Sequence, residues 1–489
     1  MAIGIYRFGA FYGIDQSSHE GAIGAGFSPD ACNMETDDGS LRVCNGFVRH
    51  FNAPVPGEKP IRRLFVWQSL VSRRFIIIAG NDVYAYTETD ETPYWKLLMS
   101  YPETVKGLRW DCCICQINGV EHFVLACGEH FLTKWDGVGE MMQFGSDETQ
   151  AAHKVNFLCM HYGRLFAAGD PEHPIRLYWS QAPGDNRSIE NWSADDASPN
   201  TGGGHVEIGD TAGDPITGLI SLSNQLLIFK RRSIYRLLGD RPSNYSVYRV
   251  HAEVEQMNNS ACVLYGDAPF WMTGGGLYFF DGQNAQKSRY ARRISRVTEN
   301  AKFGNCRAAK RGTKLYFSAY EESRDEEKLG KLRIYDNALI VYDTERQTYM
   351  LRRGFNISDL CSHDGTLYMV NENRLIYRFD EGEDYDGQPI EAYWHTPLTD
   401  LNSKPTIKGL RELFLQGVGY SENAVLLLNY RIDASRHYER FLMPRDEADV
   451  MEIPLKNEGR TFAFCFLNEA GSRWRILGGV ELLTEQRLR

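Results

Sequence analysis

The chain has 489 residues, of which 43% are hydrophobic and 12% aromatic, and its formal net charge at pH 7 is −10. This length predicts several folding units or one large repeat-built unit, and the many Tyr and Phe residues favour pleated strands over long helices. The negative charge argues against a protein whose overall field holds nucleic acid or an anionic membrane.

The cysteines and the lack of long apolar segments indicate in which cellular compartment the protein is made and whether it spans a membrane. Eleven cysteines, an odd number without framework spacing, indicate reduced thiols in a protein made in the cytoplasm. Cys112, Cys113 and Cys115 crowd one expected strand, and we expect them to be buried like small apolar side chains rather than to bind a metal. No segment has the roughly 18 apolar residues of a membrane helix, and the first residues lack a secretory signal pattern. We therefore expect neither a membrane span nor signal-directed secretion.

Residues 1–55 are irregular and rich in Gly, which predicts an extended N-terminal arm. Its backbone polar groups must find partners elsewhere, so we expect the arm to pack along the following domain or a neighbouring subunit. On this interpretation, loss of residues 2–45 impairs assembly more than it impairs folding of the body.

From Ile61 onward, short apolar or alternating runs are separated by Gly, Asn and Asp, as in successive strands. One phrase, an apolar strand that ends in an aromatic residue and usually a polar turn, recurs every roughly 40 to 60 residues, the period of a four-stranded propeller blade. Its copies are 83–86, 132–137, 176–180, 234–237, 277–282, 339–343 and 375–380. A second strand precedes most copies, at 163–168, 224–229, 312–317 and 365–369.

Such hairpins cannot bury their apolar faces alone, whereas radial stacking buries those faces and protects the strand edges. The pattern predicts an all-β protein with a β-propeller of six to seven blades over residues 56–387, with a sandwich of many hairpins as the alternative. We expect the repeated aromatic residues Tyr278, Phe280, Tyr316 and Tyr342 to pack between sheets.

The rhythm stops after the acidic stretch 380–387, which we interpret as a solvated linker because it lacks the pattern of a calcium loop. Strands expected at 410–416, 424–430, 461–467 and 475–483 then predict a C-terminal β-sandwich over residues 388–489.

No motif points to a catalytic, cofactor or metal site. Residues 201–205 have the glycines of a phosphate loop without the following Lys and Ser or Thr, and the twelve histidines lack ligand spacing. Acidic pairs such as Asp195 with Asp196 and Glu253 with Glu255 are non-specific in a chain with 64 carboxylates. We therefore expect a non-enzyme that uses no cofactor.

Basic residues recur near expected strand ends, at 62–63, 73–74, 230–232, 292–293 and 352–353. Solvated loops and interface salt bridges account for most such groups, and contact with DNA phosphates or with an acidic partner is the sharper alternative. We select five of them as rim contacts to an acidic partner ring, because Arg pairs bidentately with carboxylates: Lys230, Arg231, Arg232, Arg292 and Arg293.

Three phrases resemble phage tail proteins of the packaged-DNA stabilisation or tail-hub kind. The first begins at Ser28, contains Asn33 and Met34, and continues from Gly39 as G-x-L-R-x-x-x-G-F to Phe47. The second joins 164–170 to 177–180 and 191–192, and the third is 227–237. The phrases are loose, are spread over most of the chain and contain no catalytic signature.

The resemblance implies a structural virion protein, made in the host cytoplasm, in the tail between the portal-adaptor proteins and the distal tail proteins. Such a component forms a homo-oligomeric ring, which we expect to be hexameric, helps to seal packaged DNA and docks other tail proteins. We expect double-stranded DNA to pass without tight binding because the chain is acidic. A propeller glycoside hydrolase or glycan-binding protein and a cellular kelch- or WD-like scaffold are the alternatives.

Overall fold

The computed structural model describes residues 2–70, 72–87, 94–105, 109–146, 154–195, 198–210, 213–250, 261–321, 326–328, 331–333, 337–445, 447–469 and 471–486. The fold is all-β, and the helices that we name are the short segments η2 (Pro242–Asn244), η4 (Ala291–Ile294) and α1 (Ser295–Thr298). No helix in this described part of the chain is long and apolar enough to cross a membrane.

The described residues between Ile61 and Phe379, together with residues 47–49, build seven successive antiparallel sheets of four or five strands. The first four sheets contain β8 (Ile61–Gln68), β9 (Arg73–Ala79), β10 (Asp82–Thr87) and β11 (Lys96–Ser100); β12 (Asp111–Ile117), β13 (Val120–Ala126), β14 (Thr133–Trp135) and β15 (Met142–Gln143); β16 (Phe157–His161), β17 (Arg164–Ala168), β18 (Arg176–Trp179) and β19 (Gly204–Glu207); and β20 (Ile216–Ser221), β21 (Gln225–Lys230), β22 (Ile234–Leu238) and β23 (Ser246–Val250).

The last three sheets contain β24 (Cys262–Tyr265), β25 (Ala268–Thr273), β26 (Gly276–Phe280) and β27 (Ala285–Lys287); β28 (Ala301–Lys302), β29 (Ala308–Arg311), β30 (Lys314–Glu321), β33 (Asn337–Asp343) and β34 (Thr348–Arg352); and β35 (Asp359–His363), β36 (Thr366–Val370), β37 (Ile376–Phe379) and β7 (Phe47–Arg49). Between β30 and β33, β31 (Glu326–Lys328) and β32 (Lys331–Arg333) form a separate hairpin.

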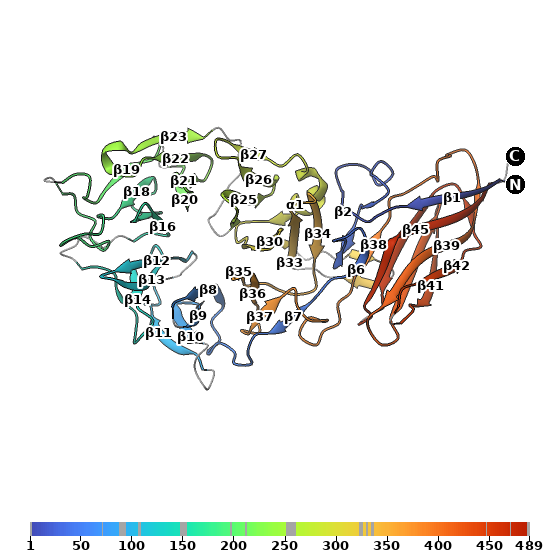
Figure 1. The fold of residues 1–489 in the computed structure, drawn as a ribbon, viewed down its shortest axis with the longest axis horizontal. Helices are drawn as coiled ribbons and strands as arrows, with labels where there is room; N and C mark the ends of the chain where they lie inside the picture. The colour runs from blue at the N-terminus through green and yellow to red at the C-terminus, as the bar shows by residue number, and fades with distance from the viewer. Residues whose placement is uncertain are drawn as a thin grey trace.

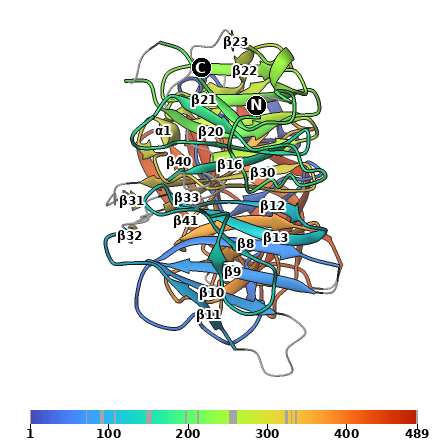
Figure 2. The ribbon, with the colours of Figure 1, turned by 90° about the vertical axis from the view of Figure 1, so that its left-hand side faces the viewer.

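These sheets are arranged around a common axis, with β8, β12, β16, β20 and β35 toward the centre (Figure 1), and Figure 2 shows the same arrangement from the side. Strand β12 contacts β16, which contacts β20; β24 contacts β29, which contacts β35; and β35 contacts β8 of the first sheet. This radial arrangement is a β-propeller.

Apolar clusters fill the spaces between successive sheets. The rings of Phe65 and Phe123 lie 5.7 Å apart between the first and second sheets, and so do those of Trp67 and Trp135. Further clusters join the second sheet to the third, the third to the fourth, the fourth to the fifth and the last to the first. Because each sheet buries both faces, every hairpin depends on its neighbours for stability.

The recurring sequence phrase is the third strand of each four-stranded sheet and β33 of the five-stranded one, and the strand paired before it is the second strand or, in the five-stranded sheet, β30. The aspartate that often closes the phrase has a defined task in the following turn. Asp281 Oδ1 accepts hydrogen bonds from the backbone N–H groups of Gln283 (2.8 Å) and Asn284 (2.7 Å), and Asp136 Oδ1 accepts one from Val138 (2.8 Å). The repeat therefore supplies both the packed strand and the aspartate that binds backbone N–H groups of the following turn. The predicted β-propeller is confirmed.

Strand β7 completes the last propeller sheet. Residues Phe47–Arg49 pair in antiparallel fashion with residues 377–379 of β37. The last sheet thus combines three strands from the end of the propeller sequence with one strand that precedes its start, which holds the first and last sheets together.

Two further sheets follow the propeller and pack face to face (Figure 1). The ring of Phe8 in one sheet lies 5.7 Å from that of Phe464 in the other. The larger sheet contains β42 (Asp449–Pro454), β39 (Lys408–Gly419), β45 (Trp474–Gln486), β6 (Leu41–Val43), β5 (Met34–Glu35), β1 (Ala2–Phe8) and β43 (Glu458–Gly459). The smaller contains β4 (Ala31–Cys32), β38 (Tyr393–His395), β44 (Phe462–Asn468), β40 (Val425–Ile432) and β41 (Ser435–Leu442).

The N-terminal residues are strands of these units and not the extended arm expected for residues 1–55. Strands β1, β5 and β6 lie in the larger C-terminal sheet, β4 lies in the smaller one, and β7 lies in the propeller. A parallel pair, β2 (Gly13–Ile14) with β3 (Phe27–Ser28), packs against β34 through β2. The expected boundaries at residues 55 and 387 therefore divide the sequence but not the folded units, because residues before 55 belong both to the propeller and to the C-terminal sheets. Residues 2–45 include strands and buried side chains such as Phe8 and Leu41, so we expect their loss to impair folding as well as assembly, and which of the two suffers more stays a prediction.

Phe280 tests the packing between sheets. Its side chain is buried between the fourth and fifth sheets, and Tyr278, Tyr316 and Tyr342 are buried as expected. We expect Phe280→Ala to lower the free energy of unfolding by about 3–5 kcal/mol, because the ring leaves a cavity that its neighbours cannot fill. Urea unfolding followed by tryptophan fluorescence measures the loss. Tyr248→Ala, at a half-exposed site on β23, is the control, and equal losses for both variants would contradict the packing.

Candidate functional site

Two of the five basic residues selected from the sequence are engaged inside the molecule. Lys230 is buried at the end of β21, where its Nζ donates to the backbone oxygen of Ile208 and lies 5.5 Å from the ring centre of Tyr235. Burial lowers the pKa of this ammonium group. Lys230 therefore ties the fourth sheet to the connection that leaves the third sheet, and it does not provide the expected rim contact.

Arg293 also binds within the chain. Its guanidinium lies 4.4 Å from the ring centre of Phe27 and 4.2 Å from that of Tyr290, and its Nε lies 3.5 Å from the Asp15 carboxylate. It also donates to the backbone oxygen of Gln347 (3.3 Å). Arg293 thus fastens the N-terminal segment to the connection that follows the fifth sheet, a position that the sequence did not indicate.

Arg231, Arg232 and Arg292 are exposed and lie on one face of the propeller. Because neighbouring strands alternate in direction, the turns between second and third strands emerge on the same face as the connections to the next sheet. Arg231 and Arg232 occupy such a turn, which Asp214 fixes by accepting a hydrogen bond from the backbone N–H of Arg232 (2.6 Å). Arg292 occupies such a connection, so these three residues stay candidates for contact with an acidic partner.

The innermost strands surround a cavity of about 280 Å³. Arg63 Nε lies 3.0 Å from Asp359 Oδ2, and Arg307 Nε lies 2.9 Å from Asp359 Oδ1. This ion triad joins the first, sixth and last sheets. Burial raises the pKa of three thiols that also line the cavity, which keeps them neutral and weakly nucleophilic: Cys112, Cys262 and Cys361.

The remaining sequence candidates lie in structural positions or outside the described residues. Cys113 and Cys115 pack between the second and third sheets, and burial raises the pKa of Cys115 to about 12. Among the described residues that line the central cavity, Asp359 is the one carboxylate, and it is bound by Arg63 and Arg307. Asp195 accepts a hydrogen bond from the backbone N–H of Ser198 (3.0 Å) in a loop. Asp196, Glu253 and Glu255 lie outside the described residues.

A buried ion network joins the propeller to the C-terminal sheets. Arg352 of β34 pairs with Glu35 of β5 and with Asp380 (3.1 Å), which follows β37, and it donates to the backbone oxygen of Asn45 (3.0 Å). The side chains of Arg352 and Glu35 are only 1% and 2% exposed, and Arg42 of β6 is a second cation on Glu35. Charges this deeply buried are tolerated because each has several partners of opposite sign or polarity.

The chain passes between the C-terminal sheets and the propeller twice, once before β7 and once after β37. These two segments lie side by side in the region of the ion network, which we call the joint. The backbone N–H of Gly46 donates to the oxygen of Gly382 (3.2 Å), and that of Phe47 donates to Asp384 (3.0 Å). A Cβ at Gly46 would lie 1.7 Å from the backbone oxygen of Asp384, so only glycine fits there. The acidic stretch 380–387, interpreted from the sequence as a solvated linker, is therefore a structural part of the joint.

The phrase from Ser28 to Phe47 supplies much of this joint. Asn33, with a φ of 55°, donates through its side-chain amide to the backbone oxygens of Arg353 (2.9 Å) and Glu391 (2.8 Å). Its carbonyl oxygen accepts the backbone N–H of Arg353 (2.9 Å). The first of the three phage-like phrases thus links the propeller to the C-terminal sheets.

The second phrase also serves structure. Arg164 is buried in β17 and donates to the backbone oxygens of Ser180 (2.6 Å) and Gly202 (2.8 Å), which holds the long connection between β18 and β19. A Cβ at Gly203 would lie 2.5 Å from the backbone of Trp192. The glycines noted as similar to a phosphate loop are therefore needed for close packing.

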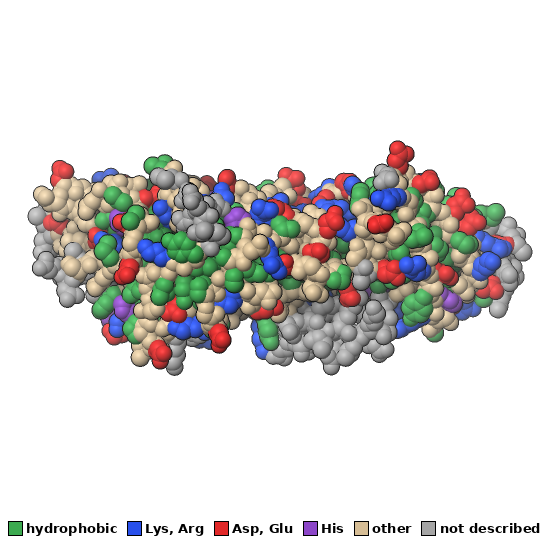
Figure 3. All heavy atoms as spheres, turned by 90° about the horizontal axis from the view of Figure 1, so that it is seen from below, with side chains coloured by type: hydrophobic (Ala, Val, Ile, Leu, Met, Phe, Trp, Pro, Cys, Tyr) green, Lys and Arg blue, Asp and Glu red, His purple; other side chains and the backbone are tan. Residues whose placement is uncertain are grey.

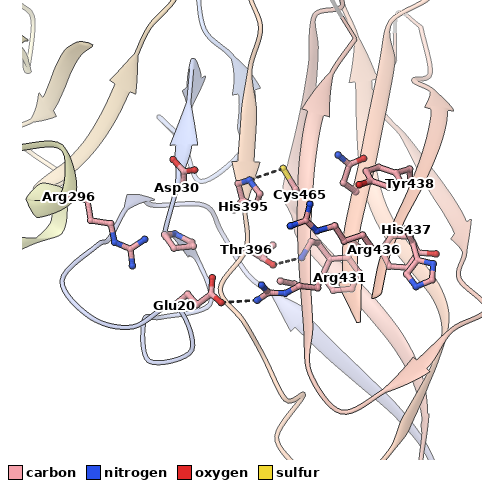
Figure 4. A pocket seen from close by; sticks show the side chains of 15 residues that line it. Glu20, Asp30, Arg296, His395, Thr396, Arg431, Arg436, His437, Tyr438 and Cys465 are labelled. Carbon is pink, nitrogen blue, oxygen red and sulfur yellow. Dashed lines mark hydrogen bonds and ion pairs between the residues drawn. The ribbon is translucent and has the colours of Figure 1, made fainter. Parts of the chain in front are cut away.

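A cleft of about 310 Å³ lies where the outer face of the smaller C-terminal sheet meets the N-terminal loop and the propeller (Figure 4). Arg431 of β40 pairs there with Glu20 of the N-terminal loop (2.8 Å). The other labelled side chains come from the sheet, the loop and α1: Asp30, Arg296, His395, Thr396, Arg436, His437, Tyr438 and Cys465.

The sequence does not indicate this cleft, because the arginines that line it are single residues on separate elements. One signal was present: Arg431 and Arg436 stand symmetrically about Asp433 and Ala434, and a hairpin with this turn places the two arginines opposite each other.

No protein-family model and no curated protein matches the chain. Among solved structures it is similar to PorZ, a surface component of the type-IX secretion system of Porphyromonas gingivalis, at 11% identity and a TM-score of 0.38, over 71% of this chain and 42% of PorZ. It is also similar to the Pan2 WD40 domain of Neurospora crassa (7%, TM-score 0.40, 69% of this chain and 94% of that one) and to the WD40 propeller of Doa1 (8%, 0.36, 67% and 94%). The chain thus spans less than half of PorZ, and the fold rests on the strand pairing described above.

Because Glu35 is buried in the ion network of the joint, we expect its removal to destabilise the folded chain strongly. Glu35→Ala leaves the buried Arg352 with one carboxylate fewer, and we expect it to lower the free energy of unfolding by about 3–5 kcal/mol. Urea unfolding measures this loss. As a control, Glu481→Ala breaks an exposed pair with Arg7 and should cost under about 1 kcal/mol. Two equally small losses would mean that the buried network does not hold the joint.

Proposed function

We propose that this chain is a structural component of a phage virion tail, a ring-forming connector that helps to seal packaged DNA and docks other tail proteins. The observation that carries the proposal is the place of the phage-like phrase 28–47, which builds the buried joint between the propeller and the C-terminal sheets. Buried ions and paired crossings favour a fixed angle between two bodies. A connector that presents two docking surfaces needs such an angle.

We further propose that the seven sheets are the seven blades of one closed propeller and that the two C-terminal sheets form a β-sandwich. In support, strand β7 completes the last sheet as an outer strand, and the two C-terminal sheets share one apolar core.

In this proposal, DNA passes between the subunits of a hexameric ring and not through the propeller. The cavity of about 280 Å³ is smaller than the roughly 300–1,000 Å³ pockets that hold small ligands, so it has no room for a double helix. The net charge of −10 favours weak attraction to the passing DNA.

Charge reversal on the basic face tests the docking role. We expect the Arg231→Glu/Arg232→Glu variant to fold normally, because both side chains are exposed, and to enter tail particles poorly, because it loses contact with an acidic portal-adaptor or distal tail protein. Particle composition by gel electrophoresis measures incorporation. Arg241→Glu, in the turn at the opposite face of the same sheet, is the matched control. Normal incorporation of the double variant would contradict the assignment of this face.

A gel-shift titration tests the relation to DNA. Near physiological salt we expect the purified chain to bind non-specific duplex with a Kd weaker than about 1 µM, since its acidic body offers few phosphate contacts. Tighter binding would contradict a passive conduit. Cleavage of a host polysaccharide by the same preparation would favour the hydrolase alternative over the structural role.

A further inference from the structure

Three polar side chains form a row across the smaller C-terminal sheet. His395 of β38 and Asn429 of β40 are the direct cross-strand neighbours of Cys465 of β44, one on each side. Direct neighbours in an antiparallel pair share one face of the sheet, and their Cβ atoms lie about 4.5–5.5 Å apart. All three residues line the cleft of about 310 Å³. The strand register thus places a thiol between an imidazole and an amide in one cleft.

The thiol and the imidazole are in contact. Sγ of Cys465 lies 3.5 Å from Nε2 of His395 in a hydrogen bond (Figure 4). The thiols of Cys159 and Cys306 in the propeller instead donate to backbone oxygens. A base in contact with a thiol activates it, because the base accepts the S–H proton and leaves the nucleophilic thiolate. Cys465 is 3% exposed and His395 is half-buried, so a substrate reaches the pair through the cleft that both residues line.

Asn429 and Asp30 extend the row on its two sides. Among the described residues, the side-chain amide of Asn429 has no hydrogen-bond partner, so its N–H groups are free to bind a carbonyl oxygen in the cleft. On the other side, the backbone N–H of His395 donates to the backbone oxygen of Asp30 (3.1 Å), and the Asp30 side chain also lines the cleft. A carboxylate near the base favours the imidazolium that forms when His395 accepts a proton.

The size and charge of the cleft favour a small ester as substrate. A volume of about 310 Å³ is at the lower end of the roughly 300–1,000 Å³ found for small-molecule pockets, which suits a small acyl compound better than a polymer. Three arginines and two acids line the cleft: Arg296, Arg431, Arg436, Glu20 and Asp30. On the face in Figure 3, acidic and basic side chains are likewise interspersed over the C-terminal sheets. Because neither sign dominates, we expect the reacting carbonyl group, and not a charge, to define the substrate.

We propose that Cys465, His395 and Asn429 form a hydrolytic site for small carboxylic esters. His395 accepts the thiol proton, and the sulfur of Cys465 attacks the carbonyl carbon while Asn429 donates to the carbonyl oxygen. The bond to the alcohol oxygen breaks, and the alcohol leaves with the proton that His395 held. Water, deprotonated by His395, then attacks the thioester on Cys465; the carboxylic acid is released and the sulfur regains its proton from His395.

This activity goes beyond the proposed tail function and does not depend on it. It departs from the expectation of a non-enzyme, which was based on the lack of a catalytic motif. No such motif exists here because the three residues lie on three strands that only the sheet brings together.

The test uses the full chain and para-nitrophenyl acetate, and it measures the release of para-nitrophenolate by absorbance. We expect a burst of about one equivalent per chain, from acetylation of Cys465, followed by slower turnover. Peptide mass mapping of an acid-quenched sample should place the acetyl group on Cys465. Cys465→Ala should abolish the burst. Cys159→Ala, which removes a half-buried thiol of β16, is the matched control and should leave the burst unchanged.

Loss of the base separates catalysis from the mere presence of a thiol. We expect His395→Gln to lower the burst rate at least about hundredfold near neutral pH, and we expect this deficit to shrink at alkaline pH, where a thiol ionises without a base. His205→Gln, which removes an exposed imidazole of the propeller, is the matched control. Circular dichroism melting checks that each variant folds. Absence of a burst, acetylation spread over several cysteines, an unchanged rate in His395→Gln or a burst without turnover would overturn the proposal.

Discussion

The buried pair of Arg352 and Glu35 is the interaction on which the rest of the structure depends. It brings together the outer strand of the sixth propeller sheet, the N-terminal strand β5 and, through Asp380, the exit from the last sheet. A cation and a carboxylate can be this deeply buried only if each is surrounded by partners, so the network constrains every segment that supplies one. The positions of the two chain crossings follow from this requirement.

The joint makes the propeller and the C-terminal sheets mutually dependent. The chain enters β7 from the C-terminal sheets and returns to them after β37, so closure of the propeller and formation of the larger sheet use the same N-terminal residues. Glu35 and Arg352 are 317 positions apart, and β1 pairs with β45 at the other end of the chain. We expect such long-range pairing to form after the propeller hairpins, because loop closure over these distances carries a higher entropic cost than local pairing.

Polar groups inside the propeller differ in kind from those at its surfaces. The Arg63 and Arg307 side chains form ion pairs with Asp359 across the innermost strands, and burial raises the pKa of the neighbouring thiols. In contrast, the cleft on the smaller C-terminal sheet places a thiol, an imidazole and an amide side by side. Stability is thus concentrated in the core and the joint, whereas capacity for binding lies on the surface.

The sequence by itself determined the repeated strands, the polar turns that follow them and the buried aromatic residues such as Phe280, because alternation and turn chemistry act over a few neighbouring residues. Only the tertiary structure decided the fate of charges and of strands too short to show a period. Lys230 and Arg293 bind partners within the chain, and Arg431 lies opposite Arg436 in a hairpin whose second strand was not predicted. The strands within residues 28–47 joined sheets formed hundreds of residues away, since the partner of a two-residue strand or of a charged side chain is set by long-range packing and leaves no local pattern.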